Sequence, residues 1–315
     1  MKIRTAGLLD LARIEEMHRF AEIKLSEAAP PAVHLWSILS STLSALLPLA
    51  QDTLIYVAED NGKVVGFIQA SGQPQALDLR MARVLQVLNL QVADEADTDE
   101  VAPALVEHLC RQALERGALR LFVRLPDRDP LLPAFRMKGF RQYATEQVLF
   151  SERPKQRSDE FPPGLRPSKR GDDRNLHHLY RKVTPQGVSQ LEAPTFREWK
   201  ALHAGEAAGS YVVDRIEVVG WVRMQRGGAA RPNTLQFLAL PESPLPAELA
   251  DFGISLLGDS HEPAWSSLRH YDSHMIEALR GRGFRVLLTQ LLLVMELAVR
   301  VPKQVREKGL VPSFG

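Results

Sequence analysis

One short segment occurs twice in the chain and constrains its fold more than any other feature. It has the sequence AFRMKGF at residues 134–140 and ALRGRGF at residues 278–284. Each copy is typical of a helix that ends at a glycine able to adopt positive φ. Each then leads into an apolar, β-rich run, at 143–150 and at 286–297. A helix–glycine–strand joint that recurs in this way predicts two domains of one fold.

Length and composition agree with two soluble domains. The chain has 315 residues, 45% hydrophobic and 24% charged, so either half is long enough to bury its own core. A net charge of +1 gives no overall attraction to nucleic acid. The single cysteine, Cys110, excludes an internal disulfide and a cysteine-cluster zinc site. Because it falls in a helical pattern, we interpret Cys110 as a small core residue rather than a nucleophile.

No segment of the sequence predicts export or membrane insertion. The first residues, 1–5, carry no apolar signal region. The longest apolar run, 286–299, is interrupted by Thr289, Gln290 and Glu296 and is too short to span a bilayer. We therefore expect a cytoplasmic protein that does not contact a membrane.

The first half alternates strands and helices in a definite order. Periodicity and breaker residues predict a strand at 3–4, a helix after 10, a helix over 33–47, a hairpin over 53–68, a strand at 84–92, a helix at 101–116, a strand at 119–125 and a helix at 130–138. The hairpin prediction rests on Asn61-Gly62 between two alternating runs. The strand at 84–92 is almost wholly apolar, so we expect it at the centre of a sheet.

The second half repeats this order after a polar, proline-containing linker. Its predicted elements are a strand at 165–167, a helix through 172–180, a broken helix around 196–202, a hairpin over 211–224, a strand at 234–240, a helix at 246–257, a strand at 265–269 and a helix at 273–280. We predict an N-terminal domain at 1–152, a linker at 153–162, a C-terminal domain at 163–300 and a tail at 301–315.

This order resembles the GNAT superfamily of N-acetyltransferases. The joint resembles the family's Phe-Tyr-x-x-x-Gly-Phe segment, and the hairpin segments 57–67 and 218–221 are similar to the family at the same place. The resemblance covers almost the whole chain as two tandem copies, about 1–152 and 163–300. It implies an α/β (α+β) fold of two tandem GNAT-like domains, each a mixed, mostly antiparallel sheet flanked by helices.

The resemblance also implies a place for acetyl-CoA. In the family, its pyrophosphate binds backbone N–H groups at the start of the helix that follows the central strand, where the helix end supplies positive potential. In the first copy this position corresponds to Leu90, Gln91, Val92, Thr98 and Val101. We take these five residues as the candidate cofactor site.

Both copies depart from the family at that loop. Residues 94–100 contain neither glycine nor arginine but five carboxylates, which would repel a pyrophosphate. Residues 240–246 contain three prolines, which remove N–H donors. The two loops therefore argue against tight cofactor binding in either copy.

The family's acid and base are not evident either. The tyrosine that protonates the leaving thiolate falls on Phe135 and on Leu279, and neither has a hydroxyl. For a base, the sequence offers only Glu59 and Asp60 beside the hairpin turn, which we interpret as solvated. The catalytic residues stay unassigned.

Two further patterns were weighed for other functions. His270 and His274 have the i, i+4 spacing of a helical zinc pair, but residues 271–273 resemble a turn and no third ligand is evident, so we predict no metal site. Basic residues around the linker alternate with acidic ones, which favours a solvated linker over a nucleic-acid surface.

Two functions remain open at this point. The first is an acyltransferase that moves an acyl group from acyl-CoA, with acetyl-CoA as co-substrate, to an amine of a small molecule or protein. The alternative is a non-catalytic binding or scaffold protein that kept the two-domain fold and lost the cofactor loop. In either case we expect the ligand at the splayed central strands, near 88–91 and 237–240.

Overall fold

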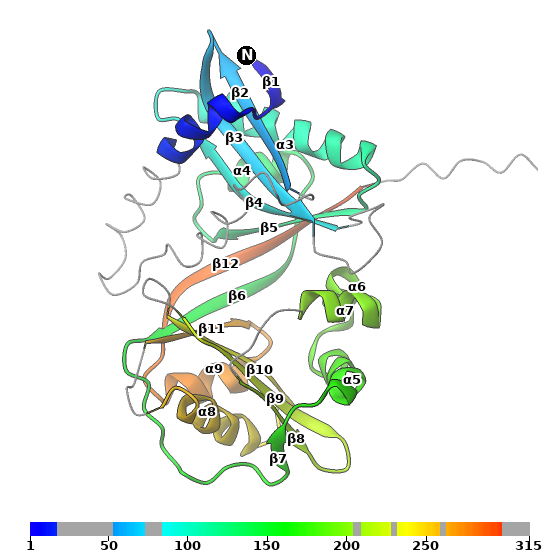
Figure 1. The fold of residues 1–315 in the computed structure, drawn as a ribbon, viewed down its shortest axis with the longest axis vertical. Helices are drawn as coiled ribbons and strands as arrows, with labels where there is room; N and C mark the ends of the chain where they lie inside the picture. The colour runs from blue at the N-terminus through cyan, green and yellow to red at the C-terminus, as the bar shows by residue number, and fades with distance from the viewer. Residues whose placement is uncertain (18–52, 73–83, 204–208, 228–231, 259–262, 298–315) are drawn as a thin grey trace, which may run out of the picture.

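The structure is a computed structural model that describes residues 1–17, 53–72, 84–203, 209–227, 232–258 and 263–297. Within these residues the strands and helices follow the predicted order in two halves, which Figure 1 shows one above the other. The mixed α/β fold predicted from the sequence is confirmed. The predicted helix over 33–47 and the tail 301–315 lie outside the described residues.

Apart from three helices of the second copy, at 173–202, the described elements of the two copies match one for one. The first copy has β1 (Lys2–Thr5), η1 (Leu8–Asp10), β2 (Thr53–Asp60), β3 (Lys63–Gly72), β4 (Val84–Val92), α3 (Thr98–Glu115), β5 (Arg120–Pro126), α4 (Leu132–Met137) and β6 (Arg141–Ser151). The second has β7 (Leu165–Pro167), η3 (Arg170–Asp172), α5 (Asp173–Val183), α6 (Gln186–Glu192), α7 (Phe196–Leu202), β8 (Gly209–Asp214), β9 (Val218–Gln225), β10 (Asn233–Ala239), α8 (Leu245–Ser255), β11 (Ala264–Arg269), α9 (Ser273–Arg280) and β12 (Arg285–Glu296).

The repeated joint has the predicted geometry in both copies. Gly139 and Gly283 have φ values of 90° and 89°, a region that favours glycine because it has no Cβ. The amide of Phe140 reaches back to the carbonyl oxygen of Phe135 at 3.1 Å, and the equivalent bond in the second joint measures 3.2 Å. This is the bond pattern of a Schellman cap, which ends the helix and directs the chain into the next strand.

A second glycine explains why both hairpins pack closely on a helix. A Cβ added at Gly66 would lie 2.8 Å from a methyl group of Val101 on α3. At the equivalent Gly220 it would lie 2.7 Å from a methyl group of Leu249 on α8. Both distances are too short for carbon atoms, so each copy needs glycine where its strand meets its helix.

The described strands form one continuous sheet in which the last strand of each copy has changed sides. The strand order is β1-β2-β3-β4-β5-β12-β6-β11-β10-β9-β8-β7. β12, from the end of the second copy, pairs with β5 of the first. β6, from the end of the first copy, pairs with β11 of the second. β6 and β12 also pair with each other and run side by side between the two halves in Figure 1.

This exchange gives the sheet an approximate twofold axis. Glu146 of β6 and Gln290 of β12 face each other in the antiparallel register. The spacing between them in sequence equals the spacing between Gly139 and Gly283, so they are equivalent residues of the two copies. The axis therefore passes through the Glu146–Gln290 pair.

Each copy has its own hydrophobic core, and each core receives a side chain from the exchanged strand. Leu293 of β12 is fully buried in the core formed by β2–β5, α3 and α4. Leu149 of β6 is fully buried in the core formed by β8–β11, α8 and α9. The predicted boundaries at 152 and 163 follow the chain and stay a prediction, because in space the final strands cross between the copies.

The segment predicted as a linker is fixed to the second copy by a buried ion pair. Arg282 and Asp251 contact each other through two charge-assisted hydrogen bonds, and both side chains are almost fully buried. The Asp251 carboxylate also accepts the backbone N–H of Arg157 at 2.7 Å. The Arg282 carbonyl oxygen accepts the N–H of Lys155 at 3.0 Å. These bonds satisfy a charge pair that would otherwise be costly to bury.

Candidate functional site

The central strands of both copies diverge where a ligand was expected. β4 and β5 are parallel and pair only as far as Val87 with Val123, whereas β4 continues to Val92 paired with β3 alone. β10 and β11 pair at only two positions, 233 with 264 and 234 with 265. A parallel pair that separates in this way exposes a gap between strands at the heart of the sheet.

The residues predicted to bind a cofactor lie together in the first copy. Leu90 and Val101 are buried in the first core, facing each other from β4 and α3. Gln91 and Val92 end β4 and Thr98 begins α3, and all three are partly exposed. The structure thus gathers the five residues at one strand–helix junction. Their part in cofactor binding stays a prediction.

The start of α3 is occupied by its own carboxylates. The side chain of Asp97 accepts the N–H of Asp99 at 2.9 Å, and its carbonyl oxygen accepts the N–H of Val101 at 2.9 Å. Glu95, in the preceding loop, pairs with Arg13 at 2.6 Å. The amides of Asp99 and Val101 are therefore already bonded, and the surrounding charge is negative.

The start of α8 in the second copy is closed as well. The N–H of Leu245 donates to the carbonyl oxygen of Glu242 at 3.0 Å. The N–H groups of Ala247 and Glu248 both donate to the carbonyl oxygen of Pro244, at 3.0 and 3.1 Å. Neither helix start presents the row of open amides that a diphosphate needs.

The positions weighed for the acid and base have structural roles. Phe135 and Leu279 are fully buried in the two hydrophobic cores, and neither side chain carries a polar group. Glu59 accepts the Arg4 guanidinium at 2.7 Å, within a cluster that ties β1 to β2. Asp60 is exposed beside the hairpin turn.

A cavity of about 440 Å³ lies on the opposite face of the sheet, where the two copies meet. The second copy provides most of its wall from α5, α6, β9, β10 and β11. The first copy provides Gln86 from β4, Phe122 and Arg124 from β5, and Tyr143 from β6. This volume lies within the usual range for small-molecule sites.

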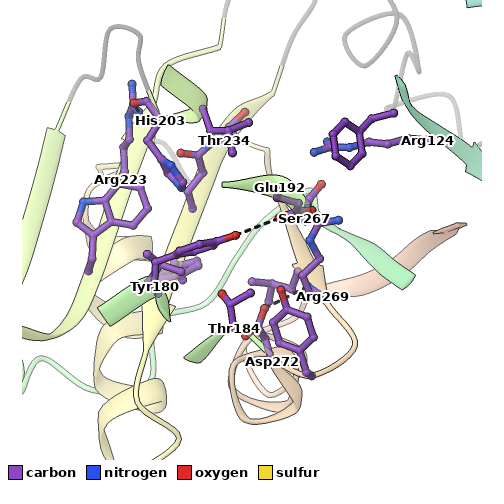
Figure 2. Close-up of a pocket in the computed structure, with 18 of the residues that line it drawn as sticks. Arg124, Tyr180, Thr184, Glu192, His203, Arg223, Thr234, Ser267, Arg269 and Asp272 are labelled. Atoms are coloured by element: carbon purple, nitrogen blue, oxygen red, sulfur yellow. Dashed lines mark hydrogen bonds and ion pairs between the residues drawn. The ribbon is translucent and has the colours of Figure 1, made fainter. Parts of the chain in front are cut away.

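A network of charged and hydroxyl groups lines this cavity (Figure 2). The carboxylate of Glu192, at the end of α6, accepts Arg269 at 2.7 Å, the Tyr143 hydroxyl at 2.8 Å and the Tyr180 hydroxyl at 3.3 Å. Arg269 also contacts the buried Glu146 at 3.2 Å. The network joins α5 and α6 to β6 and β11, so it holds the two copies in register across the cavity.

The ion pair at the centre of this network differs between the two sides of the twofold axis. Arg269 lies opposite Glu146 in the register between β11 and β6. At the equivalent place between β5 and β12, Pro126 lies opposite Gln290. Neither Pro126 nor Gln290 carries a charge, so among the described residues the Arg269–Glu146 pair has no counterpart at this position.

A smaller cleft of about 130 Å³ adjoins the cavity at the gap between β10 and β11. Its wall combines apolar side chains, among them Ala239 and Pro246 near the start of α8, with the polar groups of Lys182, Tyr271, Asp272 and His274. The cavity and the cleft share Phe237, Leu268, Tyr271 and Asp272. The two spaces therefore meet at the point where the strands separate.

Asp272 is the titratable group at this meeting point. Burial raises its pKa to about 6, and the backbone N–H of Arg269, which its carboxylate accepts at 3.2 Å, opposes this rise. Asp272 directly precedes α9 but does not cap it with its side chain. The neighbouring Tyr271 has a pKa raised by burial, so its hydroxyl stays protonated at neutral pH.

One histidine also faces the cavity. His203 stacks on Trp199 with ring centroids 4.6 Å apart, and its Nδ1 lies 2.8 Å from the Trp199 carbonyl oxygen. Nδ1 must carry the hydrogen in this contact because a carbonyl oxygen only accepts. Burial lowers the pKa of His203, so the ring is neutral at neutral pH.

The histidine pair considered for zinc does not form part of a larger ligand cluster among the described residues. His270 lies in the turn before α9, where its Nδ1 is 3.3 Å from the Thr145 carbonyl oxygen, and His274 lies in the first turn of α9 beside the cleft. The described part of the chain contains no group of three or more potential ligands. It also contains no helix with the length and apolarity needed to cross a membrane.

Comparisons with known proteins bear on this arrangement. Residues 14–140 match the profile of the acetyltransferase (GNAT) family. The first copy therefore belongs to the GNAT family. No curated protein sequence matches it.

Solved structures show the GNAT fold over both copies. A GCN5-related N-acetyltransferase from Sphaerobacter thermophilus has a TM-score of 0.64 at 15% identity, over 94% of this chain and 95% of that one. A putative acetyltransferase from Pyrococcus horikoshii has a TM-score of 0.53 at 12% identity, over 95% and 90%. A GCN5-related N-acetyltransferase from Anabaena variabilis ATCC 29413 has a TM-score of 0.51 at 14% identity, over 95% and 73%. At these identities the likeness establishes the fold.

The sequence alone did not identify the residues of the cavity. Tyr143, Glu192 and Arg269 lie on three elements that are far apart in the chain, so no local spacing connects them. Asp272 was noticed only as part of a turn. A usable signal was the difference between copies at equivalent positions, since Glu146 and Arg269 are charged where Gln290 and Pro126 are not.

Proposed function

We propose that this GNAT protein transfers an acyl group from acyl-CoA to a small amine, and that the second copy performs the reaction. The observation that carries the proposal is the shared wall of the cavity and the cleft at Tyr271 and Asp272. The apolar side chains in the cleft, such as Ala239 and Pro246, suit a thioester arm, and the polar cavity suits an amine. A group that meets both spaces is in position to move a proton between them.

The side chains at the shared wall suit the proton transfers of this reaction. The amine nitrogen attacks the thioester carbonyl carbon, the carbon–sulfur bond breaks, and the nitrogen loses one proton. The Asp272 carboxylate, with a pKa near 6, is largely deprotonated at neutral pH and accepts that proton. The Tyr271 hydroxyl remains protonated and faces the same space, where it can supply a proton to the thiolate.

Neither helix start favours the diphosphate of CoA. Carboxylates surround the start of α3, where the Asp99 and Val101 amides are already bonded, and the amides at the start of α8 are bonded within the chain. We therefore infer that affinity comes from the thioester arm in the cleft. Binding should be weaker than in a protein with an open amide cradle, since each lost charge-assisted hydrogen bond removes about 1.5–3 kcal/mol.

The same closed helix starts favour a second candidate, a GNAT-fold protein that binds a small ligand in the cavity without transferring an acyl group. In that case the network around Glu192 would serve recognition only. The notable difference between the candidates is the role of Asp272.

The experiment that separates them is a calorimetric titration with acetyl-CoA followed by a free-thiol assay with a panel of primary amines. Acyl transfer predicts binding heat and amine-dependent thiol release, with Asp272→Asn retaining the heat and losing most of the release. Asp94→Asn, in the acidic loop of the first copy, is the matched control and should change neither. Absence of thiol release with every amine would reject the transferase. A gain of acetyl-CoA binding when a glycine-containing loop replaces residues 94–100 would then support the second candidate.

A further inference from the structure

Charged groups follow one another along the wall of the cavity in a defined order. The backbone of Arg269 contacts Asp272, and its side chain contacts Glu146 at 3.2 Å. Glu146 in turn lies 3.8 Å from Arg124. Asp272 and Arg124 therefore stand at the two ends of a chain of contacts, with Arg269 and Glu146 between them. Figure 2 shows Arg124 and Asp272 on different walls.

The interior members of this series of contacts are bound mainly to one another. Arg269 binds Glu192 at 2.7 Å and Glu146 at 3.2 Å, and Tyr143 and Tyr180 donate to Glu192 as well. Two carboxylates against one guanidinium leave this interior with a net negative charge, so it does not attract a ligand carboxylate. A charged ligand group therefore gains most binding energy at the two ends of this series of contacts, Asp272 and Arg124.

Arg124 differs from Arg269 in that its guanidinium is half exposed and makes one long contact with a carboxylate. Its side chain is 51% exposed although it lines the cavity, and its contact with Glu146, at 3.8 Å, is longer than a hydrogen bond. A guanidinium has five N–H donors in a planar fork that matches a carboxylate. Within the described residues, the Arg124 side chain thus presents donors to the cavity.

We propose that the cavity binds a small amine that also carries a carboxylate, with the amine beside Asp272 and the carboxylate on Arg124. The proposal rests on the proposed function for the placement of the amine. The cavity volume of about 440 Å³ corresponds to roughly fifteen water molecules. This space accepts a small molecule such as an amino acid and leaves no room for a folded acceptor.

The inference gives the first copy a role in choosing the acceptor. Arg124 lies on β5, where its partner in the register is Leu292 of the exchanged strand β12. The strand exchange therefore fixes a side chain of the first copy in the cavity of the second. Arg124 is a specificity residue, whereas Asp272 meets the reacting nitrogen.

Calorimetry on the full chain without acyl-CoA tests the proposal. The probes are the straight-chain amino acids from 3-aminopropanoate to 6-aminohexanoate, each compared with the diamine that has an amine in place of the carboxylate. At least one amino acid should bind, and its diamine should bind at least about tenfold more weakly. Arg124→Gln should weaken the amino acid at least about tenfold and leave the diamine unchanged. Arg111→Gln, an exposed arginine on α3, is the matched control and should have no effect.

Three results would overturn the proposal: binding of none of the amino acids, tighter binding of the diamines, or unchanged affinity in Arg124→Gln. Because these titrations contain no acyl-CoA, they separate the two ideas. Amino acid binding that depends on Arg124 without thiol release would leave the inference standing and reject the transferase. Thiol release that is faster with diamines and unchanged in Arg124→Gln would support the transferase and reject the inference about Arg124.

Discussion

The exchange of final strands makes a definite prediction about stability. Leu293 lies on the last strand of the chain, yet its side chain is fully buried in the core of the first copy. We predict that Leu293→Ala destabilises the first copy rather than the second. Leu149→Ala is the reciprocal change, because Leu149 leaves the first copy to pack in the second core.

The expected magnitude follows from complete burial. Replacing a fully buried leucine by alanine costs about 2.7–5 kcal/mol through lost transfer free energy and the residual cavity. This range corresponds to a rise of roughly a hundredfold to several thousandfold in the unfolding equilibrium constant. Leu288→Ala, on the same strand but only partly buried and outside both cores, is the control and should cost less than about 2 kcal/mol.

Native-state hydrogen exchange gives the location of each effect, and urea unfolding gives its size. In Leu293→Ala, amides of α3 should lose protection while those of α8 keep more of theirs. In Leu149→Ala the pattern should reverse. If Leu293→Ala loosened α8 and spared α3, the strand would belong to the second core and the exchanged arrangement would be refuted.

Three further predictions concern single groups. If Asp272 accepts the proton, kcat/KM for acyl transfer should rise with pH up to about 6 and then level off. In a pH–rate profile, Asp272→Asn should remove this rise. A rise that is unchanged in the variant would assign the titration to another group. Because the folded pKa of Asp272, about 6, lies above its ordinary value of 3.8, this group also makes stability fall as pH rises between these two values. Urea titrations should find this slope reduced in the same variant. Asp251→Ala leaves Arg282 charged and buried, so urea unfolding should show a loss of about 3–5 kcal/mol; a loss below about 1 kcal/mol would contradict the role given to this pair. Burial raises the pKa of the Cys110 thiol to about 11, so iodoacetamide at pH 8 should label it far more slowly in the folded protein than in urea, as mass spectrometry would show, and equal rates would place it on an open surface.

Local sequence patterns predicted the elements of the fold well. Asn61 and Gly62 both have positive φ in the turn between β2 and β3, as an Asn-Gly hairpin requires. The run 84–92 forms β4 with the predicted bounds, between β3 and β5. These predictions succeed because turn chemistry and periodicity act within a few residues.

The partners of the final strands could not be predicted in the same way. β6 and β12 follow equivalent joints and both contain apolar, β-rich runs, so either could lie beside β5 on local grounds. Their choice depends on pairing across more than a hundred residues, which periodicity does not report. The cavity was missed for the same reason, since Arg124 and Asp272 meet one space only after β12 has entered the first copy.

Hydrogen exchange of the whole chain with and without saturating acetyl-CoA tests most directly which of the two copies binds the thioester. The proposal predicts new protection in residues 237–246 and 268–275, around the cleft and Asp272. Protection confined to residues 88–101 would place the thioester in the first copy and contradict it.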